Sequence, residues 1–273
     1  MPVFTPTFWG SPVAEALIEA KDVSVTFGSG SRAVHAVKGV SLEIAAGEAV
    51  GIVGESGSGK STLARILAGL QKPDTGEVLF EGQSIYERGK AYRGDKRRLV
   101  QMVFQDPYGS LNPRMTALST VAEAVRVHGD KSEGDPKDVS LKLLARMGIS
   151  ERDGGKKPRQ LSGGQRQRVS VARALSANPA VLLADEPTSA IDQSAQAQLL
   201  NLFRGLLNDG LSIALVSHDL GVIHYLTSRV YVMKDGVFVE SGPTQQIFDH
   251  PREAYTQQLI ASIPGRSLRQ ESA

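Results

Sequence analysis

Hydrophobic residues follow a period of two in several short segments near the start of the chain. Apolar and polar side chains alternate over residues 21–27 and again over residues 40–44, which is typical of strands with one buried face. Residues 76–82 and 99–104 are shorter strand candidates that stand close to turn-forming residues. We therefore expect the early part of the chain to be rich in β-structure.

Later apolar runs are continuous and do not alternate. Residues 181–184 and 212–216 are compact apolar runs, which suit strands that are buried on both faces of a parallel sheet. Residues 49–53 form another short apolar strand candidate, and a helix over residues 195–207 separates the two later runs. Strands that alternate with helices indicate an α/β fold with a mostly parallel sheet.

Helical and turn patterns fill the intervening segments. Residues 62–68 and most of residues 106–180 are predicted to be helical, with a charged surface loop at residues 131–137. Residues 231–239 contain Lys-Asp-Gly between two apolar triplets, a pattern that predicts a hairpin. The tail after Pro251 is predicted to form a short helix followed by a polar end.

Composition excludes several classes of protein. The 273 residues suffice for one large domain or two small ones. With no cysteine, the chain forms no disulfide, thiolate zinc site or iron–sulfur cluster. Its 31 basic and 29 acidic side chains are too balanced to argue for nucleic acid as a partner. No apolar run approaches the ~18 residues that cross a bilayer and no secretory signal is seen, so we expect a cytoplasmic location.

Residues 54–61 read Gly-Glu-Ser-Gly-Ser-Gly-Lys-Ser and fit the pattern G-x-x-x-x-G-K-[ST] without a mismatch. A strand precedes this glycine loop and a helix follows it, an arrangement in which backbone N–H groups cradle phosphates. Lys60 can then reach the β- and γ-phosphates, and Ser61 offers a hydroxyl to Mg²⁺. The predicted ATP-binding residues here are Gly54, Glu55, Ser56, Gly57, Ser58, Gly59, Lys60, Ser61 and Thr62. The alternative is a Gly/Ser-rich turn with an incidental lysine, which the flanking strand and helix disfavour.

Two acids end the apolar run at residues 181–184. Ligands of open α/β sheets sit beyond the carboxyl ends of strands, so Asp185 should lie near the phosphates and hold Mg²⁺. Glu186 would polarise the attacking water as a general base. The alternative is a pair of acids that merely cap a strand at the surface.

A second candidate anion site begins at residues 161–165, which read Leu-Ser-Gly-Gly-Gln and precede a helical run. Free N–H groups and the helix dipole both favour an anion there. The alternative is an ordinary helix start with Ser162 as its N-cap. Two anion sites on one chain suggest that one nucleotide is held from two sides.

These motifs together resemble the nucleotide-binding subunit of an ATP-binding cassette (ABC) transporter, over about residues 21–264. The resemblance implies a P-loop NTPase core with an antiparallel β subdomain and an α-helical subdomain at about residues 106–175. It places Gln105 in the Q-loop as an ATP and metal contact, His218 as a catalytic switch histidine beside Lys60 and Glu186, and Phe27 as the aromatic that stacks on adenine. Residues 189–192 resemble the D-loop, with Ile191 where leucine is usual. His35, His128, His224 and His250 have no such support and are expected to be surface or packing residues.

The resemblance also implies a head-to-tail dimer. ATP on one subunit's glycine loop would be completed by residues of the facing subunit, and ATP would join the subunits until hydrolysis opens the dimer. The residues expected to contact the facing nucleotide are Leu161, Ser162, Gly163, Gly164, Gln165 and Asp192.

A narrower resemblance points to the oligopeptide, dipeptide and nickel importer ATPases, in residues 104–114 and 247–256. It implies ATP and Mg²⁺ as cofactors and a related second ATPase subunit, with a homodimer as the alternative. It further implies two transmembrane permease subunits, an extracytoplasmic solute-binding protein and a peripheral place on the cytoplasmic side of the membrane. The solute is expected to be a di- or oligopeptide. The alternatives are nickel or another solute, an ATPase of a soluble complex such as one for carbon–phosphorus cleavage, and a non-hydrolysing regulator.

The expected organisation has three parts. Residues 1–18 are a flexible N-terminal arm, residues 19–250 the nucleotide-binding domain, and residues 251–273 a C-terminal extension of the oligopeptide-importer type.

Overall fold

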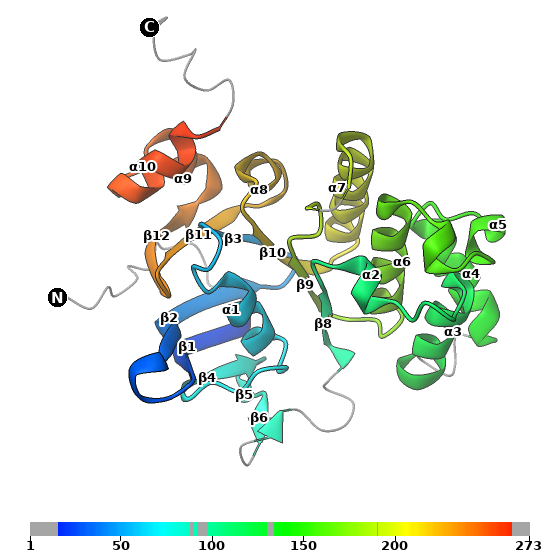
Figure 1. Ribbon diagram of the computed structural model, residues 1–273, viewed down its shortest axis with the longest axis horizontal. Coiled ribbons are helices and arrows are strands. Elements are labelled where there is room, and N and C mark those ends of the chain that lie inside the picture. The colour runs from blue at the N-terminus through cyan, green and yellow to red at the C-terminus, as the bar shows by residue number, and fades with distance from the viewer. Residues whose placement is uncertain (1–15, 88–89, 92–97, 130–133, 190, 264–273) are drawn as a thin grey trace, which may run out of the picture.

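The computed structural model describes residues 16–87, 90–91, 98–129, 134–189 and 191–263. Its centre is a six-stranded sheet (Figure 1). The strand order is β12 (Val237–Pro243), β11 (Arg229–Lys234), β3 (Ala49–Val53), β10 (Ser212–Ser217), β9 (Val181–Asp185) and β8 (Val100–Val103). Neighbours from β11 to β8 pair in parallel, and only β12 is antiparallel. The predicted α/β class, the buried parallel strands and the hairpin are confirmed.

A second sheet has four strands and is antiparallel, in the order β2 (Val34–Ala45), β1 (Ala16–Phe27), β4 (Thr75–Phe80) and β5 (Gln83–Ser84). A small two-stranded sheet pairs β6 (Tyr86–Glu87) with β7 (Lys90–Ala91). Residues 16–18, assigned to the N-terminal arm on sequence grounds, belong instead to β1. Ile18 pairs with Ile44 on one side and Phe80 on the other, and both Leu17 and Ile18 are buried in the core. Residues 1–15 of the predicted arm lie outside the described residues.

Side-chain alternation in the central strands divides the core into two layers. On β10, Ala214 and Val216 pack toward α1 (Lys60–Leu67) and the antiparallel sheet, whereas Ile213 and Leu215 pack toward the opposite helices. Such two-faced burial is what a continuous apolar strand requires. Helix α1 therefore begins at the edge of a rigid double layer, with its N-terminus at the carboxyl end of β3.

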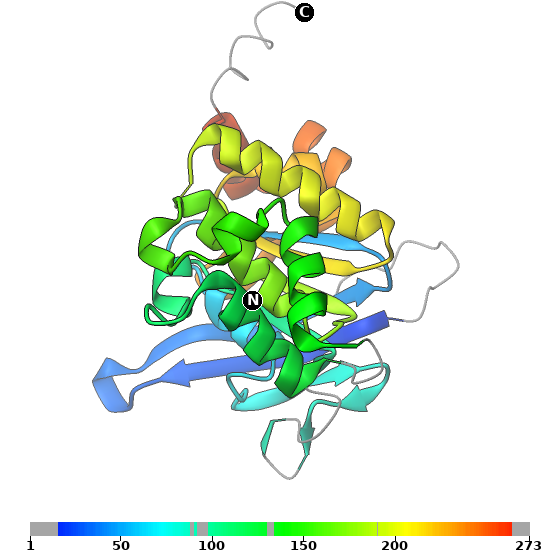
Figure 2. The ribbon, with the colours of Figure 1, turned by 90° about the vertical axis from the view of Figure 1, so that its right-hand side faces the viewer.

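Helices cover the opposite face of the central sheet, where α7 (Gln193–Asn208) lies over the strands in Figure 2. Helices α8 (Leu220–Leu226), α9 (Thr244–Asp249) and α10 (Ala254–Ala261) also pack on this side. Helix α10 lies in the predicted C-terminal extension, of which residues 264–273 are outside the described part. Among the described residues, no helix is long and apolar enough to cross a membrane.

A helical subdomain extends from one end of the central sheet (Figures 1 and 2). It comprises α2 (Pro107–Ser110), α3 (Ala117–His128), α4 (Pro136–Arg146), α5 (Glu151–Gly154), a 3-10 turn (Pro158–Gln160) and α6 (Gly163–Leu175). The loop predicted through residue 137 ends earlier, because Asp135 caps α4 by accepting from the Lys137 N–H at 2.8 Å and Pro136 suits the first helical turn. Residues 131–133 of that loop are not described.

Candidate functional site

The glycine loop connects β3 to α1 and requires glycine at two positions. Gly54 has φ +152°, and a Cβ there would lie 2.1 Å from the Met233 carbonyl oxygen. Gly59 has φ +107°, and a Cβ there would lie 2.2 Å from the Ala36 carbonyl oxygen. Any side chain at either position would collide with backbone, so the tight packing of β2 and β11 around the loop depends on these glycines.

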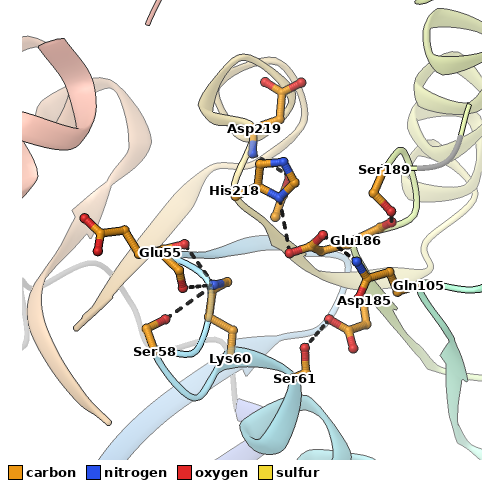
Figure 3. A network of polar contacts seen from close by, with 12 residues as sticks. Glu55, Ser58, Lys60, Ser61, Gln105, Asp185, Glu186, Ser189, His218 and Asp219 are labelled. Carbon is orange, nitrogen blue, oxygen red and sulfur yellow. Dashed lines mark hydrogen bonds and ion pairs between the residues drawn. The ribbon is translucent and has the colours of Figure 1, made fainter. Parts of the chain in front are cut away.

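Lys60 begins α1, and its ammonium group turns back into the loop (Figure 3). Its Nζ donates to the carbonyl oxygens of Gly54 at 2.8 Å and Glu55 at 2.6 Å, and to Ser58 Oγ at 3.3 Å. Burial lowers the pKa of Lys60, because its charge is held away from water, while Glu186 and Asp185 act in the opposite direction. The loop thus holds a partly desolvated ammonium group against its own carbonyl oxygens.

Ser61 lies against the carboxyl end of β9. Its Oγ donates to Asp185 Oδ1 at 2.9 Å, and Asp185 is only 3 % exposed (Figure 3). Burial raises the pKa of Asp185, and the hydrogen bond from Ser61 opposes that shift. Within the described residues, no group of three or more His, Cys, Asp or Glu could hold a metal ion on its own. A hydroxyl beside one carboxylate nevertheless fits Mg²⁺, which binds through few protein oxygens together with phosphates and water.

The Glu186 carboxylate lies between two side chains from neighbouring strand ends (Figure 3). Gln105 Nε2 donates to Glu186 Oε2 at 3.0 Å, and His218 Nδ1 lies 3.2 Å from Glu186 Oε1. Gln105 follows β8, Glu186 follows β9 and His218 follows β10, so the parallel order β8-β9-β10 brings them together. Glu186 has φ +44°, and its N–H donates to the Val216 carbonyl at 2.8 Å. This left-handed backbone conformation, uncommon for a residue other than glycine, directs the carboxylate along the strand ends.

A cleft of about 910 Å³ joins most of the predicted residues. The predicted residues that line it are Phe27, Gly54, Glu55, Ser56, Gly57, Gly59, Lys60, Ser61, Thr62, Gln105, Glu186 and His218. Ser58 and Asp185 are buried behind this wall and reach it through Lys60 and Ser61. Phe27 is 43 % exposed, so its ring offers a flat apolar face to a ligand.

Sequence reasoning missed part of the cleft. The start of β2 lines it with Val34, His35, Ala36 and Lys38, and Ala33 lines it just before the strand. Further lining comes from Leu220, Asp235, Gly236, Leu259 and Ser262. His35, expected to be a surface or packing residue, is exposed and also lines the cleft, with its Nδ1 2.9 Å from Thr26 Oγ1. The hairpin turn at Gly236 also donates its N–H to the Ser58 carbonyl at 3.0 Å. The hairpin itself was predicted, but no local pattern indicates what its turn contacts.

The second candidate anion site lies in the helical subdomain and does not line this cleft. Ser162 caps α6: its Oγ accepts from the Gln165 N–H at 3.2 Å, and Gln165 Oε1 accepts from the Ser162 N–H at 2.9 Å. Leu161 is buried, and Gly163 and Gly164 form the first turn of α6. Asp192 caps α7 by accepting from the Ala195 N–H at 2.8 Å. Within one chain, helix capping accounts for the contacts of Ser162 and Asp192.

Comparisons with known proteins match the chain to a family model and to individual relatives. Residues 37–189 match the family model described as ABC transporter. The chain is similar to the oligopeptide transport ATP-binding protein AppF of Bacillus subtilis, with 41 % identity over 92 % of this chain and 79 % of AppF. It is also similar to OppF of Streptococcus pyogenes, with 38 % identity over 92 % of this chain and 83 % of OppF.

A solved structure is similar as well. The ATP-binding cassette MJ0796, determined as a dimer in a post-hydrolysis state with ADP and Pi, aligns with a TM-score of 0.74 and 35 % identity. The alignment covers 83 % of this chain and 98 % of that one.

Proposed function

The chain belongs to the ABC transporter family and is an ATPase, and from this premise we propose that it drives the import of di- or oligopeptides. The observation that carries the catalytic part is the Glu186 carboxylate, held between Gln105 and His218 at the mouth of a phosphate-binding loop. The peptide substrate is supported by the similarity to AppF and OppF, which are named for oligopeptide transport.

In the proposed ATP complex, the loop amides of Gly57–Thr62 and the Lys60 ammonium bind the phosphates. Lys60 already points into the loop, so it exchanges carbonyl partners for phosphate oxygens without a large movement. The ring of Phe27 stacks on adenine. Ser61 and Asp185, with Gln105, would hold Mg²⁺, which would neutralise charge that develops on the phosphates.

Glu186 is the proposed general base. Its carboxylate accepts a proton from the attacking water, while Gln105 and His218 hold the carboxylate in place. His218 is 61 % exposed on the cleft side, so its ring can turn toward the γ-phosphate and stabilise charge there. Because Gln105 donates directly to Glu186, a movement of the segment after β8 would alter this contact with the proposed base.

The second set of residues is proposed to act across a dimer. The N-terminus of α6 presents the backbone of Gly163 and Gly164 and a favourable dipole, and the Ser162 hydroxyl, which accepts from the Gln165 N–H, can still donate its own proton. In a head-to-tail dimer, residues 161–165 and Asp192 would face the nucleotide of the other subunit. Support comes from MJ0796, which was solved as a dimer with ADP and Pi. The second subunit is proposed to be a related ATPase, with a homodimer as the alternative arrangement.

The proposed complex also contains two permease subunits and an extracytoplasmic solute-binding protein, with this chain bound peripherally at the cytoplasmic face. The helical subdomain is the proposed permease-binding part. It carries a hollow of about 440 Å³ lined by Pro113, Arg114, Lys157, Arg159 and Gln160, whose positive charge suits an acidic permease segment. With the whole of β1 included, residues 16–250 are the proposed nucleotide-binding domain, and residues 251–273 are its proposed C-terminal extension.

The test is uptake in cells that lack this chain. Uptake of labelled di- and oligopeptides should be lost and should return with the wild-type chain but not with Glu186→Gln. Loss of nickel uptake with normal peptide uptake would reassign the solute. Co-purification with a soluble complex and without permeases would overturn the transport role while leaving the ATPase intact.

A further inference from the structure

A hydrogen bond connects the C-terminal helix α10 to the glycine loop. The buried Tyr255 side chain places its hydroxyl oxygen 3.1 Å from the Glu55 backbone nitrogen, which donates to it. Leu259, four positions later and thus on the same side of α10, lines the proposed ATP cleft together with Ser262, the C-cap residue of the helix. One face of α10 therefore forms a wall of the nucleotide site.

The peptide unit between Gly54 and Glu55 is held at both ends. Its N–H belongs to Glu55 and donates to Tyr255, and its C=O belongs to Gly54 and accepts from Lys60 Nζ at 2.8 Å. In a planar trans peptide these two groups point in opposite directions. A rotation of the unit would therefore break the Tyr255 bond and the Lys60 bond together.

The position of Tyr255 is fixed by contacts at the start of its helix and around its ring. The buried Glu240 carboxylate on β12 accepts from the N–H groups of Arg252 at 2.9 Å and Glu253 at 3.2 Å, which anchors the start of α10. Lys234 Nζ lies 4.7 Å from the centre of the Tyr255 ring. Burial raises the pKa of Tyr255, so its hydroxyl stays protonated across the physiological range.

We propose that Tyr255 is a positioning residue for ATP binding: by holding the Gly54–Glu55 peptide it keeps the Lys60 ammonium directed into the glycine loop before nucleotide arrives. This inference rests on the proposed role of Lys60 in phosphate binding. Its physical basis is preorganisation, because a loop that already has its bound shape loses less conformational freedom when ATP binds. The C-terminal extension thus acts on the glycine loop through the Tyr255 hydroxyl.

The test compares Tyr255→Phe, which removes only that hydroxyl, with the matched control Tyr225→Phe. Tyr225 on α8 donates to Asn201 Oδ1 at 2.8 Å and does not line the cleft. Hydrogen exchange of the Glu55 amide should become faster in Tyr255→Phe and stay unchanged in the control. The affinity of Tyr255→Phe for AMP-PNP, a non-hydrolysable ATP analogue, should fall by about 2- to 12-fold, the equivalent of one hydrogen bond. KM for ATP should rise by a similar factor, with kcat changing less.

The outcomes separate this inference from the proposed function. If the wild-type chain binds AMP-PNP and Lys60→Ala weakens that binding, but Tyr255→Phe alters neither exchange nor affinity, the positioning role is overturned and the ATPase role stands. If the wild-type chain does not bind AMP-PNP, the proposed site itself is wrong. Thermal unfolding of both tyrosine variants should match the wild type within a few degrees, and a large loss confined to Tyr255→Phe would make the role structural and overturn the inference.

Discussion

Ser61 Oγ donates a hydrogen bond of 2.9 Å to Oδ1 of Asp185, although 124 positions separate the two residues. The bond connects the first turn of α1 to the carboxyl end of β9 and keeps a buried carboxylate satisfied. It also brings a hydroxyl and a carboxylate oxygen together beside the Lys60 ammonium (Figure 3), where Mg²⁺ and triphosphate are proposed to bind.

Ser61→Ala should therefore weaken Mg²⁺ binding more than it weakens nucleotide binding. The variant loses the hydroxyl and leaves Asp185 without its hydrogen bond, so we expect the Mg²⁺ concentration for half-maximal ATPase activity to rise about tenfold or more, the equivalent of a charge-assisted hydrogen bond. The measurement is a Mg²⁺ titration of ATPase rate at saturating ATP. An unchanged midpoint would exclude Ser61 as a metal ligand.

Lys60→Ala should weaken ATP binding. The buried ammonium has no equivalent in alanine, and the Gly54 and Glu55 carbonyls that it contacts would face the phosphates without an intervening positive charge. We expect at least about a tenfold loss of ATP affinity by equilibrium binding. Lys72→Ala, at an exposed residue outside the cleft, is the matched control. Equal affinity in both variants would remove Lys60 from phosphate binding.

Glu186→Gln should bind ATP but turn it over at least about 10²-fold more slowly, because an amide cannot accept the proton of the attacking water. Since ATP is then consumed slowly, the ATP-bound dimer should accumulate and elute earlier in gel filtration. Rapid turnover in this variant would show that another group serves as the base.

Ser162→Asp should abolish turnover while preserving the fold. Aspartate is as good an N-cap as serine, so α6 should remain stable. Its negative charge would repel the triphosphate of the facing subunit. Ser150→Asp, at the N-cap of α5, makes the same change at another helix start and should leave ATPase activity intact. Ser162→Arg tests the same contact by steric obstruction, and normal activity of a fully substituted dimer would contradict the two-sided site.

Glu43→Gln should stabilise the folded chain at neutral pH. Burial raises the pKa of Glu43, and Glu19, its cross-strand partner, raises it further. The folded state therefore binds the Glu43 proton more tightly than the unfolded state. The stability that this residue contributes is largest below its ordinary pKa and declines as pH rises through the raised one.

The amide removes that decline. We expect Glu43→Gln to unfold at higher denaturant concentration than wild type at pH 7, by roughly 0.2–1 kcal/mol for a like-charge cross-strand pair. The difference should vanish at pH 3, where the Glu43 carboxyl, whose pKa is raised, is protonated in the wild type. A constant difference across this range would mean that repulsion between the two acids is not the cause.

Local patterns in the sequence determined the elements and the chemistry they carry. A period of two, compact apolar runs and the spacing of glycines before Lys60 are short-range properties. Each strand that they predict overlaps an observed one, and the helix predicted after the loop overlaps α1, although β1 and β2 begin earlier than predicted. The two acids at the carboxyl end of β9 and the helix start at Ser162 could also be recognised from the sequence, because each pattern needs only a few consecutive residues.

Contacts between distant segments depended on the tertiary structure. The strand order β8-β9-β10 sets Gln105 and His218 on either side of Glu186, and no local pattern states that order. The same holds for Tyr255, whose helix follows β12 in the chain and contacts the glycine loop after β3, although β11 lies between β12 and β3 in the sheet. Sequence spacing governs which side chains share a face of one element, whereas sheet order and core packing govern which elements meet, and those are set by the burial of the whole chain.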